Sequence, residues 1–199
     1  PSRLLDPSAG TGIFAQAFKL LSPNMEVNCF EKDPITGMIL KHLRPEDKVR
    51  VEGFETIEKK YAGYYDIATS NIPFGDVAVF DPVLFSDSDP AKKIASRSIH
   101  NYFFLKSMDM VRPGGLVAFI TSQGVLNAPA NRPVREYLMS RCEPVSVIRL
   151  PSNLFREYAG TEVGSDLIVL QKREQKDLSV SNPIKQAFIE SRILSNGIS

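Results

Sequence analysis

The chain has 199 residues, of which 43% are hydrophobic and 24% charged, a composition typical of one globular domain with a sizeable core. A formal net charge of +1 creates no strong overall field, so any binding of nucleic acid must depend on a local site or on a part of the protein outside this chain. No apolar run approaches the roughly 20 residues that cross a bilayer and no signal peptide is recognisable, which argues against a membrane protein.

Short apolar runs alternate with segments of helical period, which is the pattern of an α/β domain with a mostly parallel sheet. Two of the predicted strands, 65–70 and 116–122, lack polar alternation, as expected when both faces of a sheet are covered. In chain order we expect strands at residues 3–6, 26–31, 49–53, 65–70, 116–122, 145–150 and 165–171, and helices at residues 13–21, 35–42, 97–111 and 131–141.

The last two predicted strands, 145–150 and 165–171, follow one another without an intervening helix. A parallel return needs a crossover connection, so we expect an antiparallel pair in the edge region of a seven-stranded sheet. We expect one domain over residues 1–172. Residues 173–199 are predicted to form a polar linker and then an amphipathic helix near residues 184–194, leading out of the domain.

Residues 76–96 form the longest stretch without a regular pattern. Loops of more than roughly 12–15 residues in compact domains are usually functional or disordered. Lys92, Lys93 and Arg97 could contact phosphate groups if this loop folds over a nucleic acid. A solvated cluster of charges is the favoured interpretation.

The two cysteines, Cys29 and Cys142, lie far apart in sequence, and neither has neighbours at metal-ligand spacing. They could form a disulfide, but buried free thiols in a reducing cytoplasm are the favoured interpretation. We therefore expect a cytoplasmic protein without a bound metal. The first residue is not methionine and the last five do not form a natural ending, so we expect a fragment of a longer protein.

A glycine loop follows the first predicted strand, in the run Asp6-Pro7-Ser8-Ala9-Gly10-Thr11-Gly12. Glycines let the backbone approach a ligand closely, and the next helix offers unpaired N–H groups, although a plain tight turn is the alternative. Glu31 ends the second strand roughly 20 residues later, where nucleotide-binding folds place an acid on ribose hydroxyls. Asp6 would repel a pyrophosphate and attract a cationic ligand, so the loop favours S-adenosylmethionine over NAD.

A second motif closes the fourth predicted strand, where Ser70 is followed by Asn71-Ile72-Pro73-Phe74-Gly75. This motif resembles the Asn-Pro-Pro-Tyr/Phe motif of amino-methyltransferases, and residues 6–12 resemble their first motif. The motif order is similar to that of the gamma group of adenine-N6 DNA methyltransferases. The Asn-Ile-Pro-Phe-Gly variant resembles the large methylases of restriction–modification systems and mobile elements.

The resemblance covers about residues 3–172 and implies a Rossmann-like class I S-adenosylmethionine-dependent methyltransferase fold. It implies DNA methylation at the N6 amine of adenine as the activity and S-adenosyl-L-methionine as the cofactor. The implied partner is DNA, bound mainly through a recognition domain outside this chain. The residues indicate neither the target sequence nor the oligomeric state.

The chemistry of an exocyclic amine explains these residue types, because its lone pair is delocalised into the ring. The Asn71 side-chain oxygen and the Ile72 carbonyl can hold both amine hydrogens and stabilise the growing positive charge. Pro73 restricts Ile72 to extended geometry, and Phe74 offers a flat face for a flipped-out base. We therefore expect these four residues to be catalytic. The alternative is a structural turn with Phe74 in the core.

The resemblance implies further cofactor contacts. Gly53-Phe54 resembles the third motif, where an Asp-Phe pair holds the adenine of the cofactor. Glycine replaces that Asp here, so the acid comes from Glu52 or Glu55 or is absent. Ala9, Gly10, Thr11 and Gly12 belong to the first motif and are expected to line the cofactor.

Three apolar residues resemble positions that contact the two ligands. Ile35 is similar to the residue that packs on the cofactor's adenine, and Phe103 is similar to an aromatic residue beside the cofactor. Core packing is the alternative for both. Phe155 resembles the aromatic residue on the other face of the target base, with anchoring of a loop as the alternative.

Two other functions stay open. Enzymes with the same motif methylate guanine N2 in ribosomal RNA or a glutamine amide in release factors, because the same two acceptors suit any planar amine. The chain could also be a catalytically silent module that binds cofactor or nucleic acid within a larger assembly.

Overall fold

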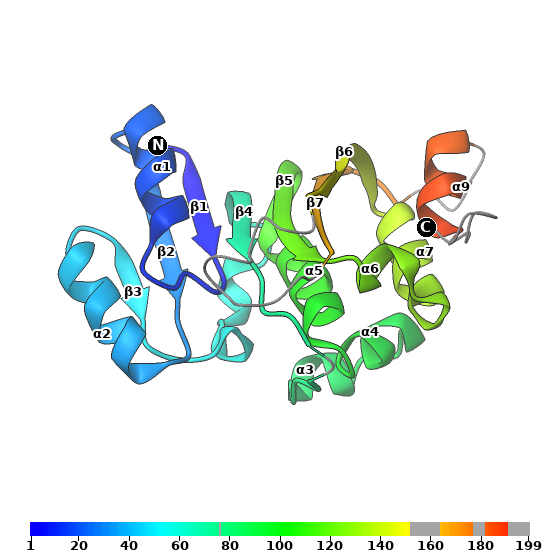
Figure 1. Cartoon of the computed structure of the whole chain (residues 1–199), viewed down its shortest axis with the longest axis horizontal. Coiled ribbons are helices and arrows are strands. Elements are labelled where there is room, and N and C mark those ends of the chain that lie inside the picture. Colours follow the sequence, from blue (N-terminus) through cyan, green and yellow to red (C-terminus); the bar gives the residue numbers. More distant parts are fainter. Residues whose placement is uncertain (76, 152–163, 177–181, 191–199) are drawn as a thin grey trace.

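The computed structural model of the chain describes residues 1–75, 77–151, 164–176 and 182–190. A seven-stranded sheet crosses the molecule in the order β3-β2-β1-β4-β5-β7-β6 (Figure 1). Its strands are β1 (Arg3–Asp6), β2 (Glu26–Phe30), β3 (Lys48–Arg50), β4 (Tyr65–Asn71), β5 (Val111–Ser122), β6 (Cys142–Leu150) and β7 (Ser165–Lys172). Neighbouring strands are parallel from β3 to β5, whereas β7 is antiparallel to both β5 and β6. The predicted sheet, mostly parallel with an antiparallel strand near one edge, is confirmed.

Helices cover the sheet from two sides. The α-helices of the described residues are α1 (Ile13–Leu21), α2 (Pro34–Leu43), α3 (Pro82–Phe85), α4 (Pro90–Ala95), α5 (Ile99–Met110), α6 (Gly124–Asn127), α7 (Arg132–Met139) and α9 (Pro183–Ile189). Short 3-10 turns lie at η1 (Phe54–Thr56), η2 (Lys59–Tyr61) and η3 (Pro129–Asn131). Leu4 of β1 packs in a cluster with residues of α1 and α2, whereas Leu5 packs in a larger cluster with α5 and α7. Because successive strand residues point to opposite faces, the two pairs of helices lie on opposite faces of the sheet.

The stretch 76–96 differs from the sequence prediction, because it contains the short helices α3 and α4. Each of these helices starts with an Asp-Pro pair. The Asp81 side chain accepts from Val83 N at 2.8 Å, and that of Asp89 accepts from Ala91 N at 3.0 Å. Aspartate at the N-cap and proline at the first helical position are favourable helix starts, which explains why such short helices form here.

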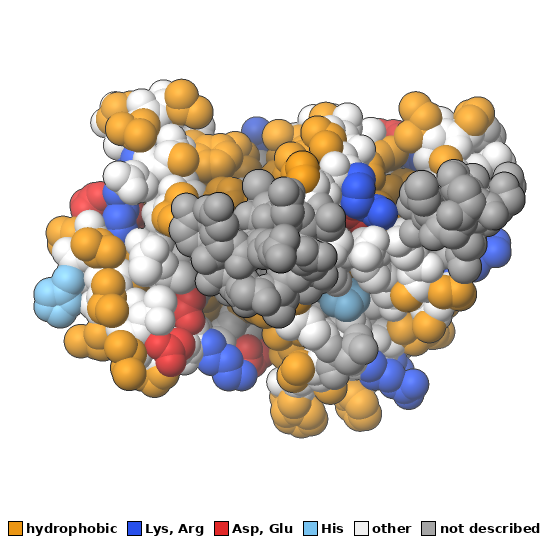
Figure 2. All heavy atoms as spheres, viewed as in Figure 1, with side chains coloured by type: hydrophobic (Ala, Val, Ile, Leu, Met, Phe, Trp, Pro, Cys, Tyr) orange, Lys and Arg blue, Asp and Glu red, His pale blue; other side chains and the backbone are white. Residues whose placement is uncertain are grey.

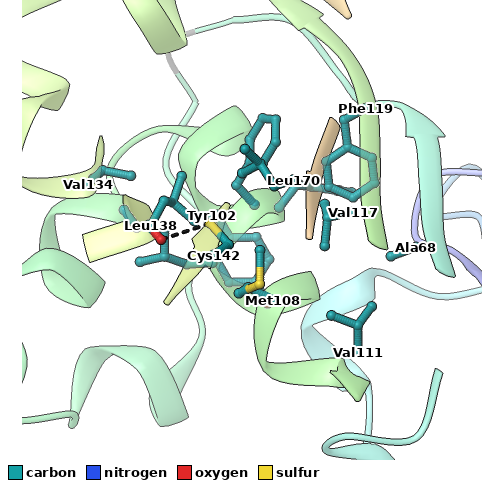
Figure 3. Packing of buried hydrophobic residues seen from close by; sticks show 14 of the residues in the cluster. Ala68, Tyr102, Met108, Val111, Val117, Phe119, Val134, Leu138, Cys142 and Leu170 are labelled. Atoms are coloured by element: carbon teal, nitrogen blue, oxygen red, sulfur yellow. Dashed lines mark hydrogen bonds between the residues drawn. The ribbon is translucent and has the colours of Figure 1, made fainter. Parts of the chain in front are cut away.

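The larger core lies between the sheet and α5 and α7 (Figure 3). Figure 3 shows side chains from three strands meeting side chains from these two helices, among them Ala68, Val117, Phe119, Leu170, Tyr102, Met108, Val134 and Leu138. Cys142 closes this core and donates from Sγ to the Leu138 carbonyl at 2.8 Å. Both cysteines are buried free thiols, as the sequence predicted.

The C-terminal helix α9 packs in this same core through Phe188 and Ile189. Arg135 of α7 is only 1% exposed and donates to the Ile189 carbonyl at 2.9 Å. Arg135 also donates to the carbonyls of Val125 (3.1 Å) and Ala128 (2.8 Å). The helix therefore packs against the domain rather than leading out of it, and residues 191–194 of the predicted helix lie outside the described residues. No described helix is long and apolar enough to cross a membrane.

Candidate functional site

The predicted site residues gather at one edge of the sheet. Asp6 ends β1, Glu31 follows β2 and Asn71 ends β4, and these three strands are parallel neighbours. The carboxyl ends of parallel strands meet at one edge, which is where α/β sheets bind ligands. The two sequence motifs therefore lie side by side, although the chain separates them.

The glycine loop between β1 and α1 turns at two residues with positive φ, Gly10 (+54°) and Gly12 (+87°). A Cβ atom on Gly12 would lie 2.6 Å from Cδ1 of the buried Leu40, so any other residue would adopt an unfavourable positive φ and also force Leu40 to shift. A Cβ atom on Gly10 would meet nothing within 4 Å. Ala9 N donates to the Phe30 carbonyl at 2.9 Å, and Thr11 is exposed beside the open space. The loop therefore packs tightly against Leu40 of α2 at Gly12 and faces open space at Gly10.

Glu31 joins this loop to the start of α2. One carboxylate oxygen of Glu31 accepts from Gly10 N at 2.8 Å, and the other accepts from Asp33 N at 2.8 Å. Each oxygen keeps a further lone pair for a hydroxyl group. The carboxylate is therefore held in a fixed orientation at the mouth of the loop, where the sequence predicted a contact with ribose.

Asp6 is fully buried beneath the loop. Its Oδ1 accepts from Ser70 Oγ at 2.8 Å and from Ser8 N at 3.3 Å, whereas its buried Oδ2 has no hydrogen-bond partner among the described residues. Burial outweighs these two hydrogen bonds and raises the pKa of Asp6 to about 7. A cation brought close to Oδ2 would favour the ionised carboxylate.

Ser70 links the two motifs, and sequence analysis did not identify it. Its Oγ lies 2.8 Å from Asp6 Oδ1 and 3.0 Å from the Ser8 carbonyl oxygen. Asn71 is the next residue along β4. The only sequence signal was its place at the end of a buried strand, immediately before the reacting motif.

The reacting motif contains the buried residue Ile72 and the exposed side chains of Asn71 and Phe74. Ile72 is 1% exposed and its N–H donates to the Ile120 carbonyl of β5 at 3.0 Å, which fixes the peptide between Asn71 and Ile72. The Asn71 side chain is exposed and makes no hydrogen bond to another described residue. Pro73 is half-buried and Phe74 is 37% exposed, so the alternative that places Phe74 in the core is wrong.

In the region of the third motif, the side chain of Glu55 lies over Gly53. A Cβ atom on Gly53 would collide with the carboxylate of Glu55, which lies directly over it and pairs with Lys32 at 3.3 Å. Glu52 instead lies 3.6 Å from Arg50. Of the two acids considered for this motif, Glu55 therefore lies next to Gly53 and beside the Glu31 turn.

The predicted apolar contacts divide into buried and exposed residues. Phe54 and Phe103 are 2% and 7% exposed, with ring centroids 5.5 Å apart, so both pack in the core. Ile35 is 74% exposed, which rules out its core alternative. It lies in an open apolar hollow of about 600 Å³ on α2, lined by Pro34, Ile35, Met38, Ile39, His42 and Leu43. Phe155 lies outside the described residues.

Solved structures of similar fold include a subunit of a restriction–modification system and a methyltransferase. A modification subunit of a putative type I restriction enzyme from Vibrio vulnificus YJ016 superposes with a TM-score of 0.72 at 16% identity, covering 87% of this chain and 41% of that one. A putative class I S-adenosylmethionine-dependent methyltransferase from Listeria monocytogenes gives 0.68 at 17% identity, covering 94% and 61%. The chain therefore has the class I methyltransferase fold.

Sequence comparison reaches a phage protein and a family. Defense against restriction protein B of Escherichia phage P1 is 26% identical over 191 residues, which are 94% of this chain. The chain spans only 8% of the length of that relative. The model of the N-6 DNA methylase family matches residues 2–192. With the motifs, their placement and the fold in agreement, the chain belongs to the N-6 DNA methylase family.

Proposed function

We propose that this chain is the catalytic domain of a methyltransferase that transfers a methyl group from S-adenosylmethionine to the N6 amine of adenine in DNA. One observation carries the proposal: the exposed Asn71 carboxamide ends β4 directly beside the glycine loop of β1, joined to it through Ser70 and Ser8. An amine held by Asn71 would lie next to a ligand held by the loop.

The residues of the loop fit S-adenosylmethionine. Asp6 offers a buried carboxylate oxygen without a partner among the described residues, which suits a cationic ligand. Gly10 leaves open space, and Glu31 presents an oriented carboxylate for ribose hydroxyls. Ile35 offers an exposed apolar side chain for the adenine ring, with Glu55 as the acid of the third motif. The cofactor, when bound, supplies a methyl group activated by a positively charged sulfur.

The role of the chain is to hold and polarise the amine. The Asn71 oxygen accepts one amine hydrogen and the Ile72 carbonyl accepts the other. Two acceptors favour a tetrahedral nitrogen and stabilise the positive charge that develops on it. The hydrogen bond from Ile72 N to the Ile120 carbonyl fixes the peptide between Asn71 and Ile72, and Pro73 restricts the backbone that carries the Ile72 carbonyl, so orientation replaces a strong base.

Phe74 completes the base pocket. It is partly exposed, three residues after Asn71, and offers a ring face to a flipped-out base. Pro73 between the two acceptors and the ring limits the movement of this turn. A net charge of +1 provides little general attraction to phosphates, so we assign most of the DNA affinity, together with sequence choice, to a recognition domain outside this chain.

The test is methyl transfer from labelled cofactor under single-turnover conditions, with duplex DNA, ribosomal RNA and a release factor as separate substrates. We expect transfer to adenine N6 in DNA, at a low rate for the chain alone. Asn71→Ala should lower that rate at least about a hundredfold, as removal of one charge-stabilising contact does in other enzymes, and leave calorimetric cofactor binding unchanged.

Asn24→Ala is the matched control, because Asn24 is an exposed residue just before β2, at the opposite edge of the sheet. Methyl transfer to RNA or protein but not to DNA would show that DNA is not the substrate. Binding of NAD but not of S-adenosylmethionine would remove the proposed reaction altogether.

A further inference from the structure

Three exposed side chains beside the site form a surface that we call the α4 edge, which consists of Phe80, Lys93 and Arg97. Phe80 is 77% exposed, although it is a large aromatic residue. Lys93 and Arg97 are exposed, and neither has a carboxylate within salt-bridge distance among the described residues. An exposed aromatic ring with unpaired cations is typical of surfaces that bind single strands of nucleic acid.

Lys92 does not belong to this surface. It lies 2.8 Å from Asp87 and 3.3 Å from Asp109, and its side chain is only 16% exposed. These carboxylates raise the pKa of Lys92. The sequence interpretation of a solvated charge cluster is therefore wrong for Lys92, and the structure separates it from Lys93 and Arg97.

Every described carboxylate of segment 77–97 is already paired. Asp81 lies 2.7 Å from Lys106, Asp87 lies 2.8 Å from Lys92, and Asp89 lies 3.9 Å from Arg141. Two of these cations, Lys106 and Arg141, come from outside the segment. Lys93 and Arg97 are therefore left without a carboxylate partner among the described residues and can bind an anion.

One backbone contact brings the segments that carry Phe80 and Arg97 together. Val79 N donates to the Ser96 carbonyl at 2.8 Å, so Phe80 and Arg97, which follow these two residues, lie on adjacent backbone segments. Lys93 lies in α4, and Arg97 lies two residues after this helix ends at Ala95. Figure 2 shows hydrophobic side chains over α3, at the lower edge of the view, next to Lys and Arg side chains over α4.

The α4 edge lies at the same edge of the sheet as Asn71. Arg97 lies two residues before α5, and the first turn of α5 contacts the start of α6, which follows β5: the His100 ring lies 3.9 Å from the position of a Cβ atom on Gly124. Asn71 pairs with Ile120 near the end of β5. The start of α5 and the end of β4 are therefore at the same side of the molecule.

We propose that the α4 edge is a contact surface for the DNA strand that carries the target base. Lys93 and Arg97 bind backbone phosphates, and the ring of Phe80 stacks on a base adjacent to the flipped one. The charge matches the phosphates, and the start of α5, just after Arg97, lies on the side of the molecule where β4 ends at Asn71. This inference rests on the proposed function and assigns residues to its substrate.

The test measures binding of a fluorescent adenine-containing single strand by anisotropy over a series of salt concentrations. Lys93→Gln with Arg97→Gln should reduce the slope of log affinity against log salt by about 1.4, since each phosphate contact to a single strand contributes about 0.7. Phe80→Ala should weaken binding at least about fivefold. The side chains of Phe80, Lys93 and Arg97 form no hydrogen bond or ion pair with another described residue, so the three changes should leave the fold intact.

The controls change matched residues at the far side. Lys41→Gln with Lys59→Gln removes two exposed cations without salt bridges among the described residues, near the ends of α2 and η2. Leu20→Ala removes a side chain on α1 that is 78% exposed. These control variants should retain the slope and affinity of the original chain.

An unchanged slope in the Lys93 and Arg97 variant, an equal change in its control, or no binding by the original chain at low salt would overturn the inference. Cofactor calorimetry and the single-turnover assay separate this failure from failure of the proposed function. If methyl transfer to DNA persists while the slope does not change, only the α4 edge is refuted.

Discussion

Replacing Asp6 by asparagine tests whether the buried carboxyl group links stability to pH. Burial raises its pKa from 3.8 to about 7 in the folded chain, a shift of about 3 units. At about 1.4 kcal/mol per unit, the ionised carboxylate destabilises the fold by about 4 kcal/mol at alkaline pH. Because the folded pKa is raised, the protonated form is the stable one, and the penalty is absent below about pH 4, grows through the interval to about pH 7 and is complete above it.

Asp6→Asn has no charge to bury, so its stability relative to the original chain should rise with pH. We expect the difference in free energy of unfolding to grow by about 2.5 kcal/mol between about pH 5 and about pH 8. Urea unfolding at half-unit pH steps measures this difference. Hydrogen bonds altered by the amide contribute equally at each pH and cancel from the slope.

Asp33→Asn is the control, because Asp33 is exposed and the backbone N–H of Thr36 lowers its pKa. Asp33 is therefore ionised throughout the interval, and the stability difference of Asp33→Asn should be constant. A flat difference for Asp6→Asn, or one that falls as pH rises, would refute the reasoning about the buried carboxyl group.

Two further substitutions test the packing around the site by urea unfolding. Gly12→Ala combines a φ of +87° with a collision against Leu40 of α2, whereas Gly63→Ala has a φ of +65° and open space. Gly12→Ala should therefore lower the free energy of unfolding by about 1–3 kcal/mol more than Gly63→Ala does. Equal losses in the two variants would contradict the collision. Asp81→Ala leaves the 5% exposed Lys106 without its carboxylate and should cost about 3–5 kcal/mol. Adding Lys106→Met should restore part of that loss, and no recovery would show that the buried charge is not the cause.

Most of the sheet could be predicted because its strands contain short apolar runs, but β3 lies at 48–50 rather than 49–53, and β5 and β6 begin at 111 and 142 rather than 116 and 145. The strands predicted at 3–6, 65–70 and 165–171 begin at the residues that the structure gives, and each lies within one residue of it at the far end. The helices α3 and α4 were missed because four and six residues are too few to show helical periodicity. Their Asp-Pro starts were the available signal, and α2 starts in the same way.

The candidate site was predictable where its residues are consecutive and follow a strand. The positions of the glycine loop and of Asn71 follow from this rule. The hydrogen bond from Ser70 to Asp6 depends on packing between strands that are distant in sequence. The position of Glu55 over Gly53 depends on a side-chain conformation. Sequence patterns encode neither of these. For Phe103, helix-core packing and a cofactor contact fit the same sequence pattern, and its 7% exposure now favours the core.

The hydrogen bonds that hold α9 against the domain depend on the side chain of Arg135 but not on the side chains at its acceptor positions. The three acceptors of the buried Arg135 guanidinium are peptide carbonyls, at Val125, Ala128 and Ile189. Every amino acid carries such a carbonyl, so side chains at these three positions can change without removing an acceptor. No other side chain has the same planar fork of five donors. Substitutions at the three acceptor positions therefore keep these hydrogen bonds, whereas a substitution of Arg135 removes all three at once.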